Sequence, residues 1–217
     1  HIDELLAFAK YLGRGSLILC LNEEGLSLSK PDGQAIRLKF QEAQQDLFNT
    51  SSAPTMEEAL KAIAPLLQKT GLITHDAKRF LHRLQALNLP IPEVIHDTMV
   101  LCYLRNPQER GYELSNFAAQ DAQGIALLLK DRLEGVKQEG METLYLDIEL
   151  PLVRVLFDME AEGFQVDKEP LIDMGQRFSE QTKQLQEEIY ALTGVKGFNI
   201  NSPQQLGRVL FEDLKLP

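Results

Sequence analysis

The chain has 217 residues, of which 44% are hydrophobic and 25% are charged, a composition typical of a globular protein with one large domain or a domain and a half. No apolar run approaches the roughly 18 residues that a membrane-spanning helix needs, and the N-terminus does not show the pattern of a secretion signal. The formal net charge of −10 argues against a protein that binds nucleic acid over most of its surface.

The two cysteines, Cys20 and Cys102, lie within the apolar runs LILCLN and MVLCYL. That setting is typical of buried free thiols in a reducing compartment rather than of a disulfide or a metal pair. We therefore expect a cytoplasmic protein without contact to a membrane.

The charge is unevenly distributed along the chain. Residues 1–137 carry 15 Lys/Arg against 17 Asp/Glu, whereas residues 138–217 carry 7 against 15. Within the acidic second part, the window 189–211 contains no acid at all and includes Lys196 and Arg208. If any segment contacts a polyanion, this window is the one that the charge pattern indicates.

The first third of the chain predicts a short helix followed by strands. Apolar periodicity favours a helix over 2–12, and the continuous apolar run Leu17–Leu21 is typical of a buried strand. Alternating residues at 26–29 and 35–40 flank Pro31-Asp32-Gly33 and predict a hairpin. Residues 41–54 are polar and predict a loop.

Helices and strands then alternate. The expected order is a helix capped by Thr55, a strand at 72–74, a helix capped by Asp76, a strand at 94–95, a helix from Asp97 to Leu104, and a helix over 114–133. This order predicts an α/β domain with a mixed sheet.

The stretch Met141–Gly163 predicts one amphipathic core helix. Pro151 either kinks this helix or begins a second one, and Gly163 ends it. The apolar stripe that we expect to be buried consists of Met141, Leu144, Tyr145, Ile148, Leu152, Val155, Leu156 and Met159.

Residues 168–217 predict a helical hairpin. One seam consists of Leu171, Met174, Phe178, Leu185, Ile189 and Leu192, and a shorter one of Leu206, Val209, Leu210 and Leu214. Gly194 and Gly197 lie between them and suit a chain reversal. We expect the two seams to cover each other.

Three segments in the second half carry a family resemblance: ELPLVRVLFDMEAEGFQVD, EEIYALTG and FNINSPQQLGRVLFEDLKLP. Together they resemble bacterial DNA polymerases of family A, in which a helix leads from the 3′–5′ exonuclease-like domain into the polymerase thumb. The resemblance implies a ribonuclease H-like, DnaQ-type exonuclease domain over 1–137. A connecting helix and the N-terminal part of an α-helical thumb would then occupy 138–217. Palm and fingers would lie beyond Pro217, so we do not expect this chain to polymerise DNA by itself.

The proofreading exonucleases of this family cleave with two metal ions held by four carboxylates, and a tyrosine orients the water. Here Leu21-Asn22-Glu23 stands for the Asp-x-Glu of the first motif. Phe80 falls on the metal-binding aspartate of the second motif. Phe117 replaces the tyrosine of the third motif, and Asp121 keeps its aspartate.

Only Glu23 and Asp121 thus remain of the four carboxylates, and Mg²⁺ requires such hard oxygen ligands. We expect an inactive, structural exonuclease-like domain without a bound metal. The alternative is an active metal-dependent 3′–5′ exonuclease, of the proofreading or ribonuclease D-like type, with an altered carboxylate cage.

The thumb resemblance implies a contact with DNA. In the family, the turn between the thumb helices grips the backbone of the primer–template duplex, which assigns this role to Asn199, Asn201, Ser202 and Gln204. Lys196 and Arg208 are added from the acid-free window. The implied partners are primer–template DNA and the remaining polymerase domains in cis, in DNA replication and repair.

No other catalytic motif stands out. His75, His82 and His96 lack the spacing of a zinc site, and neither a GxSxG motif nor a glycine-rich phosphate loop is present. We expect no cofactor for this chain, although the parent polymerase would use Mg²⁺. A pure protein-interaction module is disfavoured because the thumb motif is specific.

Overall fold

A computed structural model describes residues 2–12, 15–31, 34–41 and 53–217. The chain forms two compact units, residues 1–163 and 164–217. Residues 138–163, expected from the sequence to belong with the second segment, belong here to the first unit. No helix in the described ranges is both long enough and apolar enough to cross a membrane.

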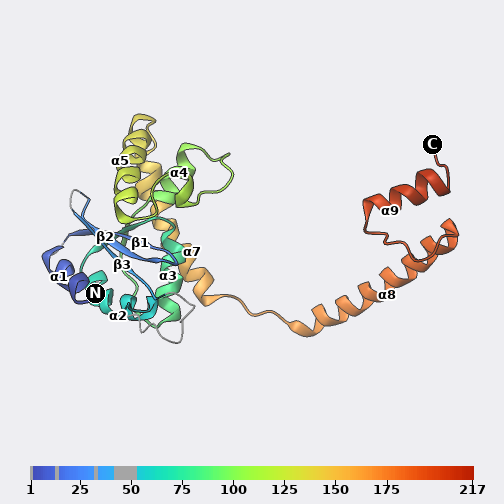
Figure 1. The fold of residues 1–217 in the computed structure, drawn as a ribbon, viewed down its shortest axis with the longest axis horizontal. Helices are drawn as coiled ribbons and strands as arrows, with labels where there is room; N and C mark the ends of the chain where they lie inside the picture. The colour runs from blue at the N-terminus through green and yellow to red at the C-terminus, as the bar shows by residue number, and fades with distance from the viewer. Residues whose placement is uncertain (1, 13–14, 32–33, 42–52) are drawn as a thin grey trace. The chain divides into compact units, whose positions relative to one another are not determined.

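The first unit is built on a five-stranded mixed sheet (Figure 1). The strand order is β3-β2-β1-β4-β5, in which β2 and β3 are antiparallel additions to the parallel strands β1, β4 and β5. The strands are β1 (Ser16–Leu21), β2 (Gly25–Ser29), β3 (Ala35–Lys39), β4 (Gly71–Thr74) and β5 (Val94–Asp97). The α/β class with a mixed sheet is confirmed. The turn predicted at 31–33 and the loop at 41–54 lie largely outside the described residues.

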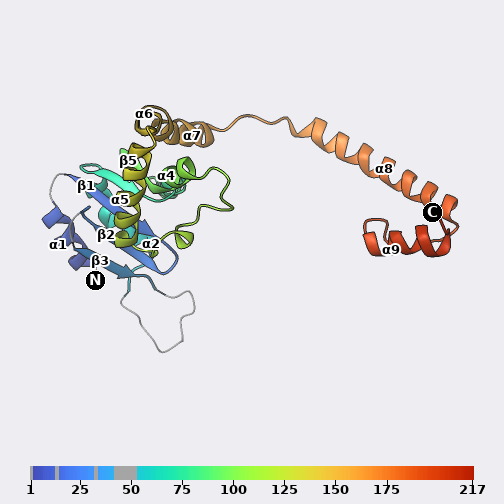
Figure 2. The ribbon, with the colours of Figure 1, turned by 90° about the horizontal axis from the view of Figure 1, so that it is seen from above.

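Strand β1 is buried on both faces, as its continuous apolar run predicted. Leu17 and Leu19 point into one core, with α1 (Ile2–Leu12), α2 (Met56–Leu67) and α3 (Ala77–Ala86). Ile18 and Cys20 point into the other core, with α4 (Thr98–Arg105) and α5 (Ala122–Gln138). The sheet is therefore covered by helices on both sides (Figures 1 and 2).

The predicted helix starts are confirmed at three caps and wrong at a fourth position. Thr55 forms a capping box with Glu58, and Asp76 and Asp97 accept hydrogen bonds at the starts of α3 and α4. The helix predicted from Leu114 begins only at Ala122. Residues Leu114–Asn116 form a separate 3-10 turn (η1), and Asp121 caps α5 by accepting from Gly124 N–H at 2.8 Å.

The amphipathic stripe predicted for Met141–Gly163 was largely wrong. After α6 (Glu142–Leu144), a π-helical turn, η2 (Tyr145–Glu149), precedes α7 (Leu150–Glu162). A π turn contains about one residue more than an α turn, so it rotates everything that follows by one position. Val153 and Phe157 are consequently buried, while Tyr145, at the start of the turn, is buried as predicted. The following members of the predicted stripe are exposed instead: Ile148, Leu152, Val155, Leu156 and Met159.

The second unit contains the 26-residue helix α8 (Lys168–Thr193), the 6-residue helix α9 (Pro203–Arg208) and a π-helical turn, η3 (Val209–Asp213). The chain reverses direction after α8, and α9 lies beside the C-terminal end of α8 (Figures 1 and 2). The predicted turn after α8 is confirmed, but α9 then runs in the same general direction as α8, so the two helices do not form an antiparallel hairpin (Figures 1 and 2).

The prediction that the two seams of the hairpin cover each other was wrong. Along α8 the seam residues Leu171, Met174, Phe178 and Leu185 are each between 47% and 59% exposed. α9 and η3 together contain 11 residues against 26 in α8, and even Leu192 in the last turn of α8 is 84% exposed, so the short seam does not cover the long one. Phe198 and Val209 are the buried side chains in this unit.

Candidate functional site

A cavity of about 740 Å³ lies in the first unit, where β1 and β4 end. Leu21 is the last residue of β1, Glu23 lies two residues beyond it, Phe80 comes from α3, and Asp121 stands immediately before α5; all four line the cavity. The fold thus brings together residues up to 100 positions apart that the sequence analysis assigned to one site.

The chemistry of these four side chains is unlike that of a metal cage. Phe80 is 4% exposed and belongs to the core beneath α3. The carboxylate of Asp121 caps α5, while Glu23 is exposed. Across the described part of the chain, no group of three or more His, Cys, Asp or Glu side chains is placed to hold a metal ion.

Phe117 does not line the cavity. Its ring is stacked with that of Tyr112 at a centroid distance of 6.5 Å, and the guanidinium carbon of Arg132 lies over the ring, 5.6 Å from its centroid. Phe117 therefore packs behind Tyr112, and Tyr112 does line the cavity.

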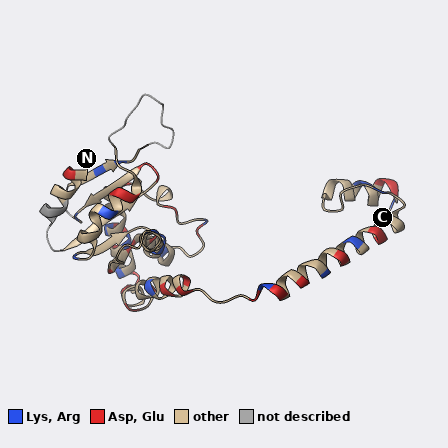
Figure 3. Ribbon diagram, turned by 90° about the horizontal axis from the view of Figure 1, so that it is seen from below, with Lys and Arg blue, Asp and Glu red and all other residues tan. Residues whose placement is uncertain are grey.

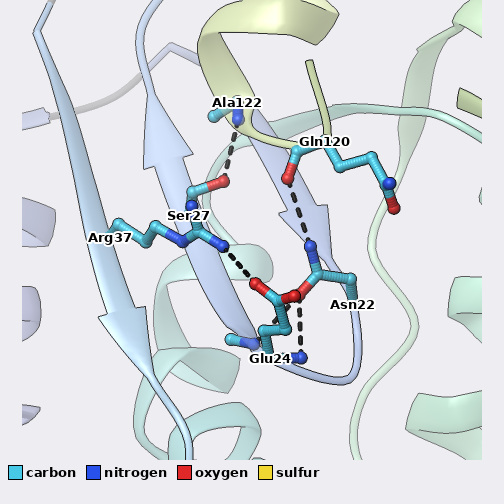
Figure 4. A network of polar contacts seen from close by, with 7 residues as sticks. Asn22, Glu24, Ser27, Arg37, Gln120 and Ala122 are labelled. Atoms are coloured by element: carbon cyan, nitrogen blue, oxygen red, sulfur yellow. Dashed lines mark hydrogen bonds and ion pairs between the residues drawn. The ribbon is translucent and has the colours of Figure 1, made fainter. Parts of the chain in front are cut away.

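A hydrogen-bond network joins the two cavity edges on which Glu23 and Asp121 lie (Figure 4). Asn22 Oδ1 accepts from the N–H groups of Glu24 and Gly25, both at 3.0 Å, and its Nδ2 donates to the carbonyl of Gln120 at 3.2 Å. Next to it, Ala122 N–H donates to Ser27 Oγ at 2.8 Å. This network was not predicted from the sequence, in which an asparagine before a turn was the available signal.

A salt bridge extends the network toward β3. Arg37 donates to Glu24 Oε2 at 3.0 Å, and both residues line the cavity (Figure 4). The turn between β1 and β2 is thus held on one side by β3 and on the other by the segment before α5.

Asp97 is a buried carboxylate at the end of β5. It accepts hydrogen bonds from the N–H groups of Asp76, Ala77 and Met99, at 3.1, 2.8 and 2.8 Å. Burial raises the pKa of Asp97, and the hydrogen bonds from Ala77 and Met99 oppose that rise. Its place outside the cavity lining and its role at two helix starts make it a structural group.

The three histidines considered in the sequence analysis do not meet. The Nε2 of His75 lies 2.6 Å from the carbonyl of Tyr112, His82 contacts Glu160, and His96 lies 3.2 Å from the Tyr145 hydroxyl. Burial lowers the pKa of His96, which favours its neutral ring.

Cys20 also lines the cavity, but burial raises the pKa of its thiol to about 11. A thiol in that state is a poor nucleophile near neutral pH.

In the second unit, the predicted DNA contacts surround the turn between α8 and α9. Several polar groups there are used within the turn. Asn199 Oδ1 accepts from Asn201 N–H at 3.0 Å, and Ser202 Oγ caps α9 by accepting from Gln205 N–H at 3.4 Å. Gln205, which the sequence analysis did not select, accepts from Asn199 N–H at 2.7 Å.

The charged residues around this turn differ from those of α8. Acidic and basic residues alternate along α8, whereas the turn contains no acid (Figure 3). Lys196 and Gln204 are exposed, and Arg208 lies 3.7 Å from Glu212 on the next helical turn. The turn therefore combines a cation, exposed amides and backbone N–H groups.

The curated proteins that are similar in sequence to this chain share one name, as two examples show. DNA polymerase I of Helicobacter pylori (strain J99) is 31% identical over 207 residues, covering 82% of this chain and 23% of that protein. A thermostable DNA polymerase I of Thermus thermophilus is 33% identical over 205 residues, covering 89% of this chain and 23% of that protein. This chain is related to bacterial DNA polymerase I. It spans about a quarter of the length of these curated relatives.

A solved structure of a DNA polymerase I has a fold similar to that of this chain. The polymerase domain of Pol1 from M. smegmatis, solved in complex with a DNA primer–template and dNTP, matches with a TM-score of 0.71 at 24% identity. The match covers 99% of this chain and 40% of that one, and it shows a shared fold. No protein-family model matches the sequence.

Proposed function

We propose that this chain is the exonuclease-like domain and the first part of the thumb of a bacterial DNA polymerase I that acts in DNA replication and repair. In this proposal residues 1–137 do not cleave DNA, and the turn between α8 and α9 contacts the backbone of the primer–template duplex. The observation that carries it is the cavity in which Leu21 and Phe80 stand beside Glu23 and Asp121.

The sheet supports a ribonuclease H-like fold for the first domain. A hairpin of β2 and β3 lies beside β1, and β4 and β5 continue the sheet in parallel. The four assigned positions gather where β1 ends and α3 and α5 begin, as a metal-dependent nuclease site on this fold requires.

Inactivity follows from charge and volume. Two metal ions need several carboxylates to hold them and to balance their charge. Leu21 and Phe80 carry no carboxylate, and one oxygen of the Asp121 carboxylate already accepts a hydrogen bond from Gly124 N–H. Mg²⁺ would serve the nucleotidyl-transfer site of the parent polymerase instead.

The alternative of a live 3′–5′ exonuclease rests on one observation, the shared cavity of Glu23 and Asp121. The two proposals are separated by incubating the protein with 5′-labelled single-stranded DNA in Mg²⁺ or Mn²⁺. We expect the substrate to stay intact. A metal-dependent ladder that disappears in Glu23→Gln would establish the alternative.

The proposed DNA contact is a backbone contact. Amide side chains and one lysine can bind phosphates without reading a sequence. Few such groups are present and the surrounding chain is acidic, so duplex binding by the isolated chain should lie at or beyond the weak end of nonspecific affinities, about 10⁻⁴ M at physiological salt.

Fluorescence anisotropy with a labelled duplex tests this contact. Lys196→Ala should weaken binding. It should also reduce the slope of log affinity against log salt concentration by about one, because one fewer counterion is released. The matched control is Lys183→Ala, which removes the same charge from α8 among acidic neighbours. Equal losses in both variants, or nanomolar sequence-dependent binding, would contradict the proposal.

We further propose that the remaining polymerase domains cover the exposed seam of α8 in cis. A 26-residue helix without a buried residue gains little from packing, and isolated helices are only marginally stable in water. A cytoplasmic location belongs to the same proposal, supported by the free thiols of Cys20 and Cys102.

A further inference from the structure

Helix α7 is apolar on two sides. Its inner side packs on the first unit through Val153 and Phe157, which are buried, and the ring of Phe157 lies 4.9 Å from that of His82 on α3. Its outer side carries four exposed apolar residues at three- and four-residue steps, which therefore form one stripe along the helix. This outer stripe consists of Leu152, Val155, Leu156 and Met159.

The outer stripe is too apolar for an ordinary surface. Its four side chains are between 38% and 64% exposed, and Ile148 in the preceding turn, η2, is exposed as well. Scattered apolar residues on a surface need no explanation, whereas a contiguous set marks a contact with another molecule or domain. A helix that is apolar on more than one side is typical of one that is packed between two layers. The first unit supplies one layer, and the stripe indicates a second.

The charges beside the stripe exclude several partners. Residues 145–163 contain five acids and one base, and that base, Arg154, donates to both carboxylate oxygens of Asp158, at 2.9 and 3.0 Å. DNA is a polyanion, and helices that lie on membrane surfaces carry lysines and arginines on their polar face, so neither partner fits. A second copy of this chain would place two such acidic segments against each other, which like-charge repulsion opposes.

The size of the stripe favours a partner within the same chain. A stable contact between separate proteins usually involves about 20–30 residues on each side, more than one helical stripe provides. Two surfaces of one chain meet at a high effective concentration, so a small contact between them can persist. The Pol1 domain with the same fold is matched over 40% of its length, and the greater part of that domain thus has no counterpart in these 217 residues.

We infer that the outer stripe of α7 docks on the part of the parent polymerase that lies outside these 217 residues. The surface that receives it has an apolar groove with basic residues at its rim, which complement the stripe and the acids beside it. Helix α7 then lies between the exonuclease-like domain and the polymerase part and joins them. The inference rests on the proposed function, because a polymerase parent supplies this partner.

Thiol alkylation measures whether the stripe is covered. Val155→Cys introduces a thiol on the outer stripe, and Leu127→Cys introduces the matched control at a position 72% exposed on α5. Burial raises the pKa of the native thiols of Cys20 and Cys102, so they react slowly. Each variant is made both in the 217-residue chain and in the full-length polymerase that contains it.

The expected result is a loss of reactivity at one position in one protein. Both introduced thiols should react readily in the 217-residue chain. In the full-length polymerase, alkylation of Val155→Cys should be slower by at least about tenfold, since a covered thiol reacts only when the contact opens. Leu127→Cys should react at the same rate in both proteins.

Three results would overturn the inference: Val155→Cys reacts equally fast in both proteins, it is already slow in the 217-residue chain, or Leu127→Cys is slowed to the same extent. Primer extension by the same full-length protein separates the inference from the proposed function. If the protein does not extend a primer, the proposed function fails and the inference fails with it. If it extends a primer while the Val155→Cys thiol stays fully reactive, the inference alone fails.

Discussion

The two units of this chain use apolar residues in opposite ways. In the first unit, β1 is flanked by strands and covered by helices on both faces, and Leu17, Ile18 and Leu19 are fully buried. In the second, α8 carries a regular apolar seam that nothing among the described residues covers. Both patterns are equally clear in the sequence.

The difference teaches that periodicity predicts a helix and its apolar face but not what covers that face. A strand in a sheet always has neighbouring strands, because its backbone hydrogen bonds hold them at one spacing. A helix satisfies its own backbone and can present an apolar stripe without a partner. Stability should accordingly differ sharply between the two units.

Hydrogen exchange should show the largest contrast. Amides of Leu17–Leu21 exchange only when the first unit opens globally, whereas those of Leu206–Leu214 need only local fraying. We expect protection in the first segment to exceed that in the second by at least about a thousandfold, given ordinary domain stabilities. Similar protection in the two segments would show that the second unit shares the cooperativity of the first.

A matched pair of leucine truncations should give the next largest contrast. Leu19→Ala empties a fully buried position and should cost about 2–5 kcal/mol of unfolding free energy. Leu185→Ala, at a position 58% exposed on α8, should change it by less than about 0.5 kcal/mol. Urea titrations followed by circular dichroism measure both. A large loss in Leu185→Ala would mean that the α8 seam is covered in solution.

A pair of glycine substitutions should differ in sign, with smaller magnitudes. A Cβ at Gly124 would lie 2.0 Å from the carbonyl oxygen of Ala119, so Gly124→Ala should destabilise the first unit by about 1–3 kcal/mol. A Cβ at Gly175 meets nothing within 4 Å, so Gly175→Ala should stabilise α8 by about 0.5–1 kcal/mol.

Exchange rates near residue 124 and along α8 would resolve the two effects. Destabilisation of α8 by Gly175→Ala would indicate a neighbour that contacts this glycine, and a neutral Gly124→Ala would indicate that the Ala119 carbonyl can move.

The sequence predicted the elements whose signals are local. The apolar run of β1, the caps at Thr55, Asp76 and Asp97, and the hairpin strands are each encoded within a few residues, and the structure confirms them. The start of α5 was wrong because the apolar residues after Leu114 continue a helical pattern that the chain interrupts before Asp121.

The candidate site was predictable only where its residues lie in local sequence motifs. Leu21, Glu23, Phe80 and Asp121 could be aligned with motifs and do line one cavity. The bonds from Asn22 to Gln120 and from Ala122 to Ser27 could not be foreseen, because each joins residues more than 90 positions apart. Their partners depend on how the start of α5 packs against β1 and β2, which no local pattern contains.

The π-helical turn at Tyr145–Glu149 has a consequence for how this chain tolerates changes of length. The turn holds one residue more than a regular α turn, and this extra residue puts Val153 and Phe157, rather than Leu152 and Leu156, on the buried face of α7. Deleting one residue there would convert the turn to an ordinary α turn without disturbing the buried face that follows. In most helices a one-residue deletion changes which side chains face the core, but here it would only remove the extra residue of the π turn. We therefore expect related sequences to vary in length at this turn.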